Sequence, residues 1–255
     1  MKKTLTFLGT GTSQGVPVIS CDCIVCKSTN KSDSRLRSSV LINIGDKNIL
    51  IDSGPDLRLQ MLREKINKID AVLYTHEHRD HVSGIDDLRS VYFSVRKEIP
   101  LYMSGRVKDA LNKDYSYLFS HKDYFGKPKF AVNVIENKNF KIFDFTIKPI
   151  KVLHYKLPVF GYIFFDLAYI TDANYISESE KKKLKGISTL IINCLQVEKH
   201  ISHFNLEECL ALIKYIKPKK AYLTHISHNL GLHEVVQKKM PKNVYLAFDG
   251  LKFGF

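Results

Sequence analysis

The sequence predicts an α/β protein, and three observations support this class. Short apolar runs, often β-branched, recur along the chain with the length of buried strands, at residues 39–44, 48–52, 69–74 and 190–193. Segments of helical character lie between several of them, at 56–65, 84–91 and 105–112. The 255 residues are 44% hydrophobic, which suffices for a sizeable core, and no linker, low-complexity tract or internal repeat interrupts them. We therefore expect one domain over residues 1–255.

In the first half of the chain, strands and helices are expected to alternate around two loops. A first strand at 4–8 leads into the glycine-rich segment 9–15, where small residues permit a tight loop. A hairpin is expected across residues 45–47, where Gly and Asp favour a turn. The elements expected up to residue 112 are strands at 4–8, 39–44, 48–52, 69–74 and 98–103 and helices at 56–65, 84–91 and 105–112. Residues 114–125 are aromatic and basic without a clear period, and packing is favoured there over a lid on the substrate.

The second half is expected to be richer in strands. They are predicted at 130–135, 140–143, 145–151, 161–165, 167–173, 190–193 and 221–224, with 161–165 and 167–173 as a hairpin. Ser202 or Asn205 can cap a helix that ends at Tyr215, and a last helix is expected at 231–239. Lysine-rich segments at 180–183 and 217–220 are typical of solvated helix ends and turns.

The net charge of +13 and the pI near 9.4 indicate a surface that attracts anions such as phosphorylated metabolites or nucleic acid. Lysines that serve only solubility explain the same charge equally well. The apolar part of residues 1–9 is too short for a signal peptide. No stretch approaches the roughly 20 apolar residues that a membrane span requires. We therefore expect a cytoplasmic protein without a membrane partner.

Residues 75–81, Thr-His-Glu-His-Arg-Asp-His, follow the strand expected at 69–74. His76 and His78 are two residues apart, so they project to the same side of an extended chain, while Asp80 and His81 follow a turn. Imidazole and carboxylate ligands together suit zinc, manganese or iron. A solvated polar loop accounts for a single histidine at a strand end, but not for four ligand-type side chains so close together. The motif therefore predicts a metal site.

The five cysteines carry a second signal. An odd number without a secretion signal argues against a disulfide framework. Cys21, Cys23 and Cys26 form a Cys-x-Cys-x-x-Cys loop at about residues 20–27, and three thiolates on one short loop suit zinc. Tetrahedral zinc needs a fourth ligand from elsewhere in the chain. The metal would give order to a loop with little regular structure of its own.

The motif at 75–81 resembles the dinuclear metal signature of the metallo-β-lactamase superfamily. The resemblance implies an αββα sandwich, in which two mixed sheets lie back to back with helices outside. It implies that His76, His78 and His154 hold one metal, that Asp80, His81 and His225 hold the second, and that Asp172 bridges them. It also suggests Asp52 as a group that orients ligands. An Asx-turn or a cap for the helix at 56–65 explains Asp52 equally well.

A narrower resemblance rests on four further features and covers essentially the whole chain. They are the Gly-Thr-Gly-Thr-Ser-Gln-Gly-Val-Pro start at 9–17, the cysteine loop, Arg-Leu-Arg-Ser-Ser at 35–39, and the pair His225 and His228. Together they resemble the phosphodiesterase of the carbon–phosphorus lyase pathway. That family cleaves phosphodiesters, notably cyclic ribose phosphates, with two metals that are commonly zinc or manganese. His228 would complete a Cys₃His structural zinc site with Cys21, Cys23 and Cys26.

The resemblance also implies a mechanism. A hydroxide that bridges the two metals would attack phosphorus, with Asp80 and Asp172 holding the metals and His203 protonating the leaving group. His200 is the second choice for the proton donor. The expected partner is a small phosphodiester substrate; nucleic acid is less favoured, and the sequence leaves a homodimer open. The alternatives are a nuclease of the transfer-RNA-processing type and a lactonase or thioesterase that uses the same metals.

Overall fold

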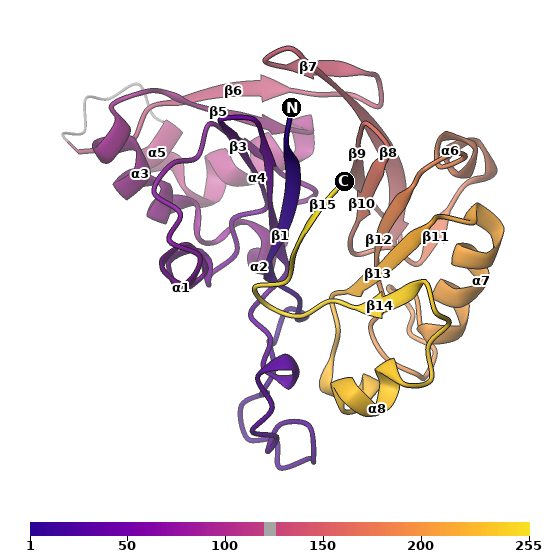
Figure 1. Ribbon diagram of the computed structural model, residues 1–255. Helices are drawn as coiled ribbons and strands as arrows, with labels where there is room; N and C mark the ends of the chain where they lie inside the picture. Colours follow the sequence, from indigo (N-terminus) through magenta and orange to yellow (C-terminus); the bar gives the residue numbers. More distant parts are fainter. Residues whose placement is uncertain (120–125) are drawn as a thin grey trace.

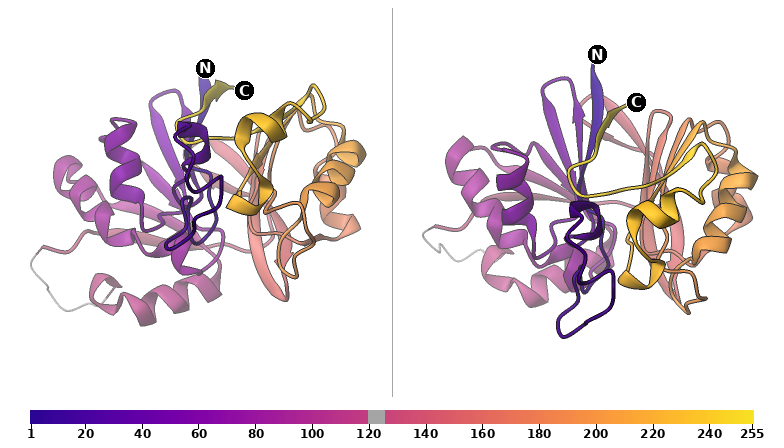
Figure 2. Two further views of the ribbon diagram at one scale, coloured as in Figure 1. Left: turned by 90° about the horizontal axis from the view of Figure 1, so that it is seen from below. Right: turned by 60° about the horizontal axis from the view of Figure 1, so that its bottom comes forward.

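Two mixed β-sheets pack face to face, and helices cover the outer side of each (Figures 1 and 2). The computed structural model describes residues 1–119 and 126–255. Helices α1 to α5 lie outside the first sheet, and α6 to α8 lie outside the second (Figure 1). This arrangement confirms the predicted αββα sandwich. No helix in the described residues is long and apolar enough to cross a membrane.

The first sheet has the strand order β15-β1-β2-β3-β4-β5-β6. Its members are β1 (Lys3–Gly9), β2 (Ser39–Ile44), β3 (Lys47–Ile51), β4 (Ala71–Leu73), β5 (Ile99–Met103), β6 (Phe130–Val134) and β15 (Lys252–Gly254). Neighbours from β15 to β3 are antiparallel, and those from β3 to β6 are parallel. The helices are α1 (Leu57–Arg63), α2 (Arg79–Val82), α3 (Leu88–Val95), α4 (Gly105–Asp114) and α5 (Ser116–Phe119), with 3₁₀ turns at Lys31–Asp33 and Ile85–Asp87.

The second sheet has the order β11-β8-β9-β10-β12-β13-β14, and β7 pairs with β8. Its members are β7 (Phe140–Ile142), β8 (Phe145–His154), β9 (Leu157–Phe164), β10 (Leu167–Ile170), β11 (Tyr175–Ile176), β12 (Thr189–Asn193), β13 (Lys220–Thr224) and β14 (Val244–Leu246). The strands from β10 to β14 are parallel, as at one end of the first sheet. The helices are α6 (Glu178–Lys183), α7 (Leu206–Ile216) and α8 (His233–Gln237), with a 3₁₀ turn at His228–Leu230.

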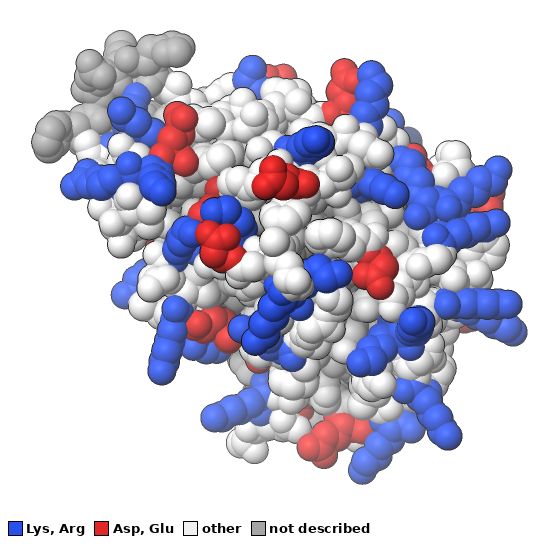
Figure 3. Space-filling model, turned by 45° about the horizontal axis from the view of Figure 1, so that its top comes forward, with Lys and Arg blue, Asp and Glu red and all other residues white. Residues whose placement is uncertain are grey.

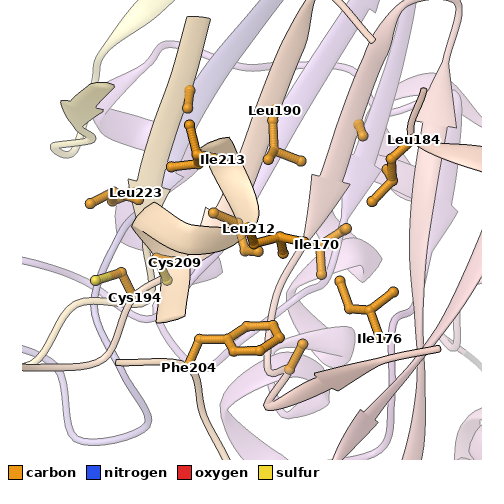
Figure 4. Packing of buried hydrophobic residues seen from close by; sticks show 14 of the residues in the cluster. Ile170, Ile176, Leu184, Leu190, Cys194, Phe204, Cys209, Leu212, Ile213 and Leu223 are labelled. Atoms are coloured by element: carbon orange, nitrogen blue, oxygen red, sulfur yellow. The ribbon is translucent and has the colours of Figure 1, made fainter. Parts of the chain in front are cut away.

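Strands in both sheets are buried on two faces, which explains their continuous apolar sequences. In β3, Ile49 and Ile51 pack between the sheets, whereas Leu50 packs against the helices. In β12, Ile191 packs between the sheets and its neighbours Leu190 and Ile192 pack under α7. Figure 4 shows this outer layer, where Leu212 and Ile213 of α7 lie over β12 and β10. The resulting rigid core fixes the strand ends on which the candidate site is built.

The structure corrects several element boundaries. Strand β9 begins at Leu157, earlier than the predicted 161, and β8 reaches His154 instead of ending at 151. Helix α3 extends to Val95, and the predicted start at 84–87 is a 3₁₀ turn. The short elements α2, α5, α6, β11 and β15 were not expected as such, because segments this short carry little periodicity. Asn205, not Ser202, caps α7, and it forms a capping box with Glu208.

The prediction for residues 114–125 is met in part. Leu118 is buried and packs with the first helical layer, as packing predicts, whereas Tyr117 is exposed and donates a hydrogen bond to Asp86. Residues 120–125 lie outside the described residues.

Candidate metal centre

The candidate site lies where strand ends of the two sheets meet. Asp52 follows β3 and residues 75–81 follow β4, both in the first sheet. Asp172 follows β10 and His225 follows β13, both in the second sheet. All four strands belong to the parallel parts of their sheets, so their carboxyl ends point to the same edge of the sandwich.

Three of these residues have left-handed backbone at the strand ends. Asp52, Asp172 and His225 have φ angles of 64°, 52° and 55°. Residues other than glycine rarely adopt positive φ, and when they do they are often found at functional sites. The sequence carries no clear signal for this conformation.

The seven predicted ligands form two sets that share Asp172. In each set, one ligand atom from every member lies within 4.8 Å of the others, and the sets are His76, His78, His154 and Asp172, and Asp80, His81, Asp172 and His225. His76 Nε2 is 3.0 Å from His78 Nδ1 and 3.8 Å from Asp172 Oδ2. His81 Nε2 is 3.2 Å from both Asp80 Oδ2 and Asp172 Oδ1. The structure therefore brings together every ligand predicted for the two metals.

These distances fit two metal ions. Two ligands of one tetrahedral cation, with bonds of about 2.0–2.1 Å, lie about 3.3 Å apart. His81 Nε2 is buried and makes no hydrogen bond of suitable geometry in the described residues, although two carboxylate oxygens lie 3.2 Å from it. An orphaned buried polar atom of this kind requires an explanation, and a cation provides one. The first set has one carboxylate beside three imidazoles and the second has two carboxylates beside two imidazoles, and both combinations suit zinc or manganese.

Groups behind the ligands orient the imidazole rings. His81 Nδ1 lies 2.7 Å from Asp52 Oδ2, and Thr75 donates to the same carboxylate from its N–H and its hydroxyl, each at 2.8 Å. His76 Nδ1 lies 3.0 Å from the Thr75 hydroxyl oxygen. These contacts fix Nε2 of both histidines toward the centre. Asp52 therefore orients a ligand and does not cap α1, whose first turn has no side-chain cap.

His154 and His225 have their own partners, which sequence reasoning missed. His154 Nδ1 donates to the carbonyl oxygen of Ser202 at 2.8 Å. His225 Nδ1 is 3.2 Å from the Ser38 hydroxyl and 3.2 Å from Asp172 Oδ1. Ser38 lies in the Arg-Leu-Arg-Ser-Ser segment, so that sequence feature has a structural role beside the candidate metal centre.

The electrostatics favour the protonation states that metal ligands need at Asp172, His76 and His225, but not at His81. Burial would raise the pKa of Asp172, but His225 and His81 lower it well below its usual range. Burial lowers the pKa of His76 well below its ordinary value and lowers that of His225 to about 4. Burial also disfavours the charged form of His81, yet Asp172, Asp80 and Asp52 together raise its pKa well above the usual value. The carboxylates around His81 thus favour positive charge at this point of the centre.

His203 reaches the centre from the second sheet's side. Its Nε2 is 3.2 Å from Asp172 Oδ2, and its Nδ1 is 3.0 Å from the Ser202 hydroxyl. The next residue, Phe204, is held by backbone hydrogen bonds from its N–H to Ala173 and from Leu195 to its carbonyl. His200 lies behind His203, with the two Nδ1 atoms 3.3 Å apart, and it is exposed.

The cysteine loop projects from the same edge of the sandwich, at the bottom of Figure 1. His228 Nδ1 lies 3.2, 3.4 and 3.6 Å from the sulfurs of Cys21, Cys23 and Cys26. With Zn–S near 2.3 Å and Zn–N near 2.0 Å, sulfur and nitrogen on one tetrahedral zinc lie about 3.5 Å apart. The backbone N–H of Cys26 lowers the pKa of Cys23 to about 6, which favours a thiolate, whereas burial raises the pKa of Cys26 to about 11. The predicted Cys₃His set is therefore brought together with distances that fit zinc.

Comparisons with known proteins identify the class. The model of the beta-lactamase superfamily domain matches residues 47–226, so the chain belongs to this superfamily. It is PhnP-like within the superfamily: a crystal structure described as a new diphosphatase from the PhnP family superposes with a TM-score of 0.94 at 37% identity, covering 100% of this chain and 98% of that one.

Two curated relatives extend the comparison. The chain is 38% identical over 248 residues to a protein named octanoyltransferase from Porphyromonas gingivalis, covering 96% of this chain but only 50% of that protein. The chain thus spans about half the length of this relative, so the relative's name does not define an activity here. It is 23% identical over 225 residues to exodeoxyribonuclease YycJ from Bacillus anthracis, covering 77% of this chain and 80% of that protein.

Proposed function

We propose that the protein is a dinuclear metal hydrolase that cleaves phosphodiester bonds in small phosphates, including cyclic ribose phosphates. One observation carries the proposal. Asp172 is shared between the two ligand sets, and His203 contacts the same carboxylate. Two cations and a proton donor would thus surround a single point, an arrangement that suits hydrolysis of a phosphodiester.

The charge of the centre favours a phosphate substrate. Two divalent cations bring four positive charges, and Asp80 and Asp172 return two, so the site keeps a positive charge that attracts a phosphate anion. When bound, the metals would lower the pKa of water and polarise phosphoryl oxygens. Asp172 and Asp80 hold the positions of the cations, and His203 would donate a proton to the leaving oxygen. A lactone lacks the negative charge that this centre favours.

The relatives' names define the competing substrates. The PhnP-family neighbour is described as a diphosphatase, which makes phosphoanhydrides a second class of small phosphate to consider. The exodeoxyribonuclease relative and the net charge of +13 favour nucleic acid as the alternative. Figure 3 turns the top of the molecule forward, away from the edge that carries the cysteine loop, and Lys and Arg side chains spread widely there with Asp and Glu among them, so the positive charge is not gathered in one patch of that face.

Comparative turnover tests this proposal. The purified enzyme, loaded with manganese or zinc, is assayed on bis-p-nitrophenyl phosphate, cyclic ribose phosphate, a nucleoside diphosphate, a single-stranded DNA, a transfer-RNA precursor and a lactone. We expect the highest kcat/KM on a small phosphodiester and loss of that activity in Asp172→Asn. A higher kcat/KM on the lactone or on either polymer would refute the proposal. The nucleoside diphosphate result decides between the two classes of small phosphate.

We also propose that Cys21, Cys23, Cys26 and His228 hold a structural zinc. Four protein ligands leave no open position for water or substrate, which is typical of structural sites. His228 lies three residues after His225, so zinc at His228 would fix the loop that carries a ligand of the second metal. The superfamily model ends at residue 226 and begins at 47, so this zinc set lies outside the region it matches.

A further inference from the structure

Two hydrogen bonds join the loop after β4 to strand β9. The hydroxyl of Tyr162 donates to the carbonyl oxygen of Tyr74 at 2.6 Å, and the N–H of Phe160 donates to the carbonyl oxygen of Thr75 at 3.1 Å. The contacts proceed in opposite directions along the two segments, as in an antiparallel pair. The two paired segments both carry predicted ligands of the first metal: the loop carries two of them, and the β8–β9 hairpin carries a third.

Arg106 makes the next connection in this series. Its Nη2 donates to the carbonyl oxygen of Pro158 at 2.6 Å and lies 3.2 Å from Glu77 Oε2. Glu77 stands between the ligands His76 and His78 in the sequence. Pro158 is next to the residue that pairs with the ligand His154 in the β8–β9 register. One guanidinium therefore contacts both segments that supply the imidazoles of the first metal.

A rigid element holds Arg106. It is the second residue of α4, whose N-cap Ser104 accepts a hydrogen bond from the N–H of Val107 at 3.3 Å. Val107 and Leu111 anchor the helix in the core with 0% and 1% exposure. The Arg106 side chain is 39% exposed and that of Glu77 is 20% exposed; Glu77 Oε2 is itself buried and has no hydrogen-bond partner in the described residues, so the 3.2 Å contact with Arg106 is an ion pair without a hydrogen bond. A guanidinium offers several donors in a fixed plane, which lysine cannot reproduce.

We propose that Arg106 is a positioning residue for the first metal site. It holds the loop of His76 and His78 against the hairpin of His154, so that the three imidazoles meet at one point. The second site has contacts of its own that do not involve Arg106: Asp52 Oδ2 lies 2.7 Å from His81 Nδ1, and the Ser38 hydroxyl lies 3.2 Å from His225 Nδ1. The inference rests on the dinuclear centre proposed above and adds a residue outside both ligand sets.

Metal titration of the metal-free protein tests the inference. In Arg106→Met, we expect the affinity of the first site for Mn²⁺ to fall about 10- to 100-fold, as is typical when a group behind a ligand is lost, while the second site changes less than about 3-fold. His154→Ala and His225→Ala identify which binding step belongs to which site. Arg79→Met is the matched control: Arg79 lies in the metal motif, but its side chain is 72% exposed and its ion pair at 3.4 Å is with Asp114.

Two further variants separate positioning from general stability. Arg106→Lys should lower the Mn²⁺ affinity of the first site less than Arg106→Met does. If the Arg106→Met protein does not fold, the Arg106→Lys protein is used for the titration instead. In Glu77→Gln/Arg106→Met, the loss should be no greater than in Arg106→Met alone, since both changes break one contact. Wild-type affinity at both sites in the Arg106 variants, or equal weakening of both sites, would overturn the inference. A wild-type protein that binds fewer than two cations would instead refute the dinuclear proposal on which it rests.

Discussion

Asp52→Asn is a sharp test of the second metal site because it changes a hydrogen-bonding pattern and little else. Asp52 is fully buried, and its carboxylate faces three donors: the N–H and hydroxyl of Thr75 at 2.8 Å each and Nδ1 of His81 at 2.7 Å. Asparagine has the same shape, but one of its two atoms is an NH₂ group that can only donate. At least one donor in the wild-type network would therefore face another donor.

The consequence reaches the metal through His81. If the amide NH₂ faces His81, Nδ1 of this ring must accept and its proton moves to Nε2. That atom lies 3.2 Å from Asp80 and Asp172, where it would bind the metal. A protonated Nε2 has no lone pair for a cation. We expect the affinity of the second site to fall at least 10- to 100-fold, the usual effect of losing such a partner, which corresponds to about 1.4–2.8 kcal/mol.

Isothermal titration of the metal-free protein with Zn²⁺ or Mn²⁺ measures this loss. Asp70→Asn is the matched control, because Asp70 accepts a hydrogen bond from the N–H of Asn48 at 2.9 Å and none from a histidine. It should bind both metals as the wild type does. Two cations bound to Asp52→Asn with wild-type affinity would show that Asp52 does not set the tautomer of His81, and would refute the reasoning.

Three other predictions concern the proton donor, the cysteine loop and acid stability. His203→Ala should keep both metals and lower the rate about 10²–10⁴-fold on a diester with a poor leaving group, but less with nitrophenolate; equal loss on both would move the role to His200. His228→Ala should lower the melting temperature and weaken the second catalytic metal while the first stays bound, and unchanged zinc content and melting would contradict the structural zinc. Glu180 is buried, which opposes its charge, but hydrogen bonds from Lys183, Asn137 and the N–H of Lys151 lower its pKa. Its contribution is therefore present above the unfolded-state pKa and is lost as pH falls through the lower folded-state pKa. Glu180→Gln should cost about 1–3 kcal/mol in urea unfolding at pH 7 and less in acid, and an equal cost at both pH values would count against this account.

The sequence by itself determined the fold class and the chemistry of the site. A short, mostly apolar run such as residues 190–193 predicts a buried strand by itself, because both faces of a parallel strand are buried. Ligand-type residues one to three apart, as in His76 to His81 and Cys21 to Cys26, are local patterns that packing does not explain. The resemblance to the metallo-β-lactamase superfamily, confirmed by the family model, supplied the distant ligands His154, Asp172 and His225.

Only the tertiary structure decided which of these groups meet and what supports them. The two sheets contribute ligands that lie up to about 150 residues apart, and no local pattern encodes their distances. The φ angles are 64° at Asp52 and 52° at Asp172, and although aspartate is enriched at positive φ, most aspartates do not adopt it, so residue type alone does not locate these positions. Ser38, Thr75 and Arg106 are ordinary polar residues in the sequence, and they become specific only through the 2.6–3.2 Å contacts that the packed sheets impose. Hydrogen bonds and ion pairs act over a few ångströms, so their partners are set by the folded chain and not by spacing along it.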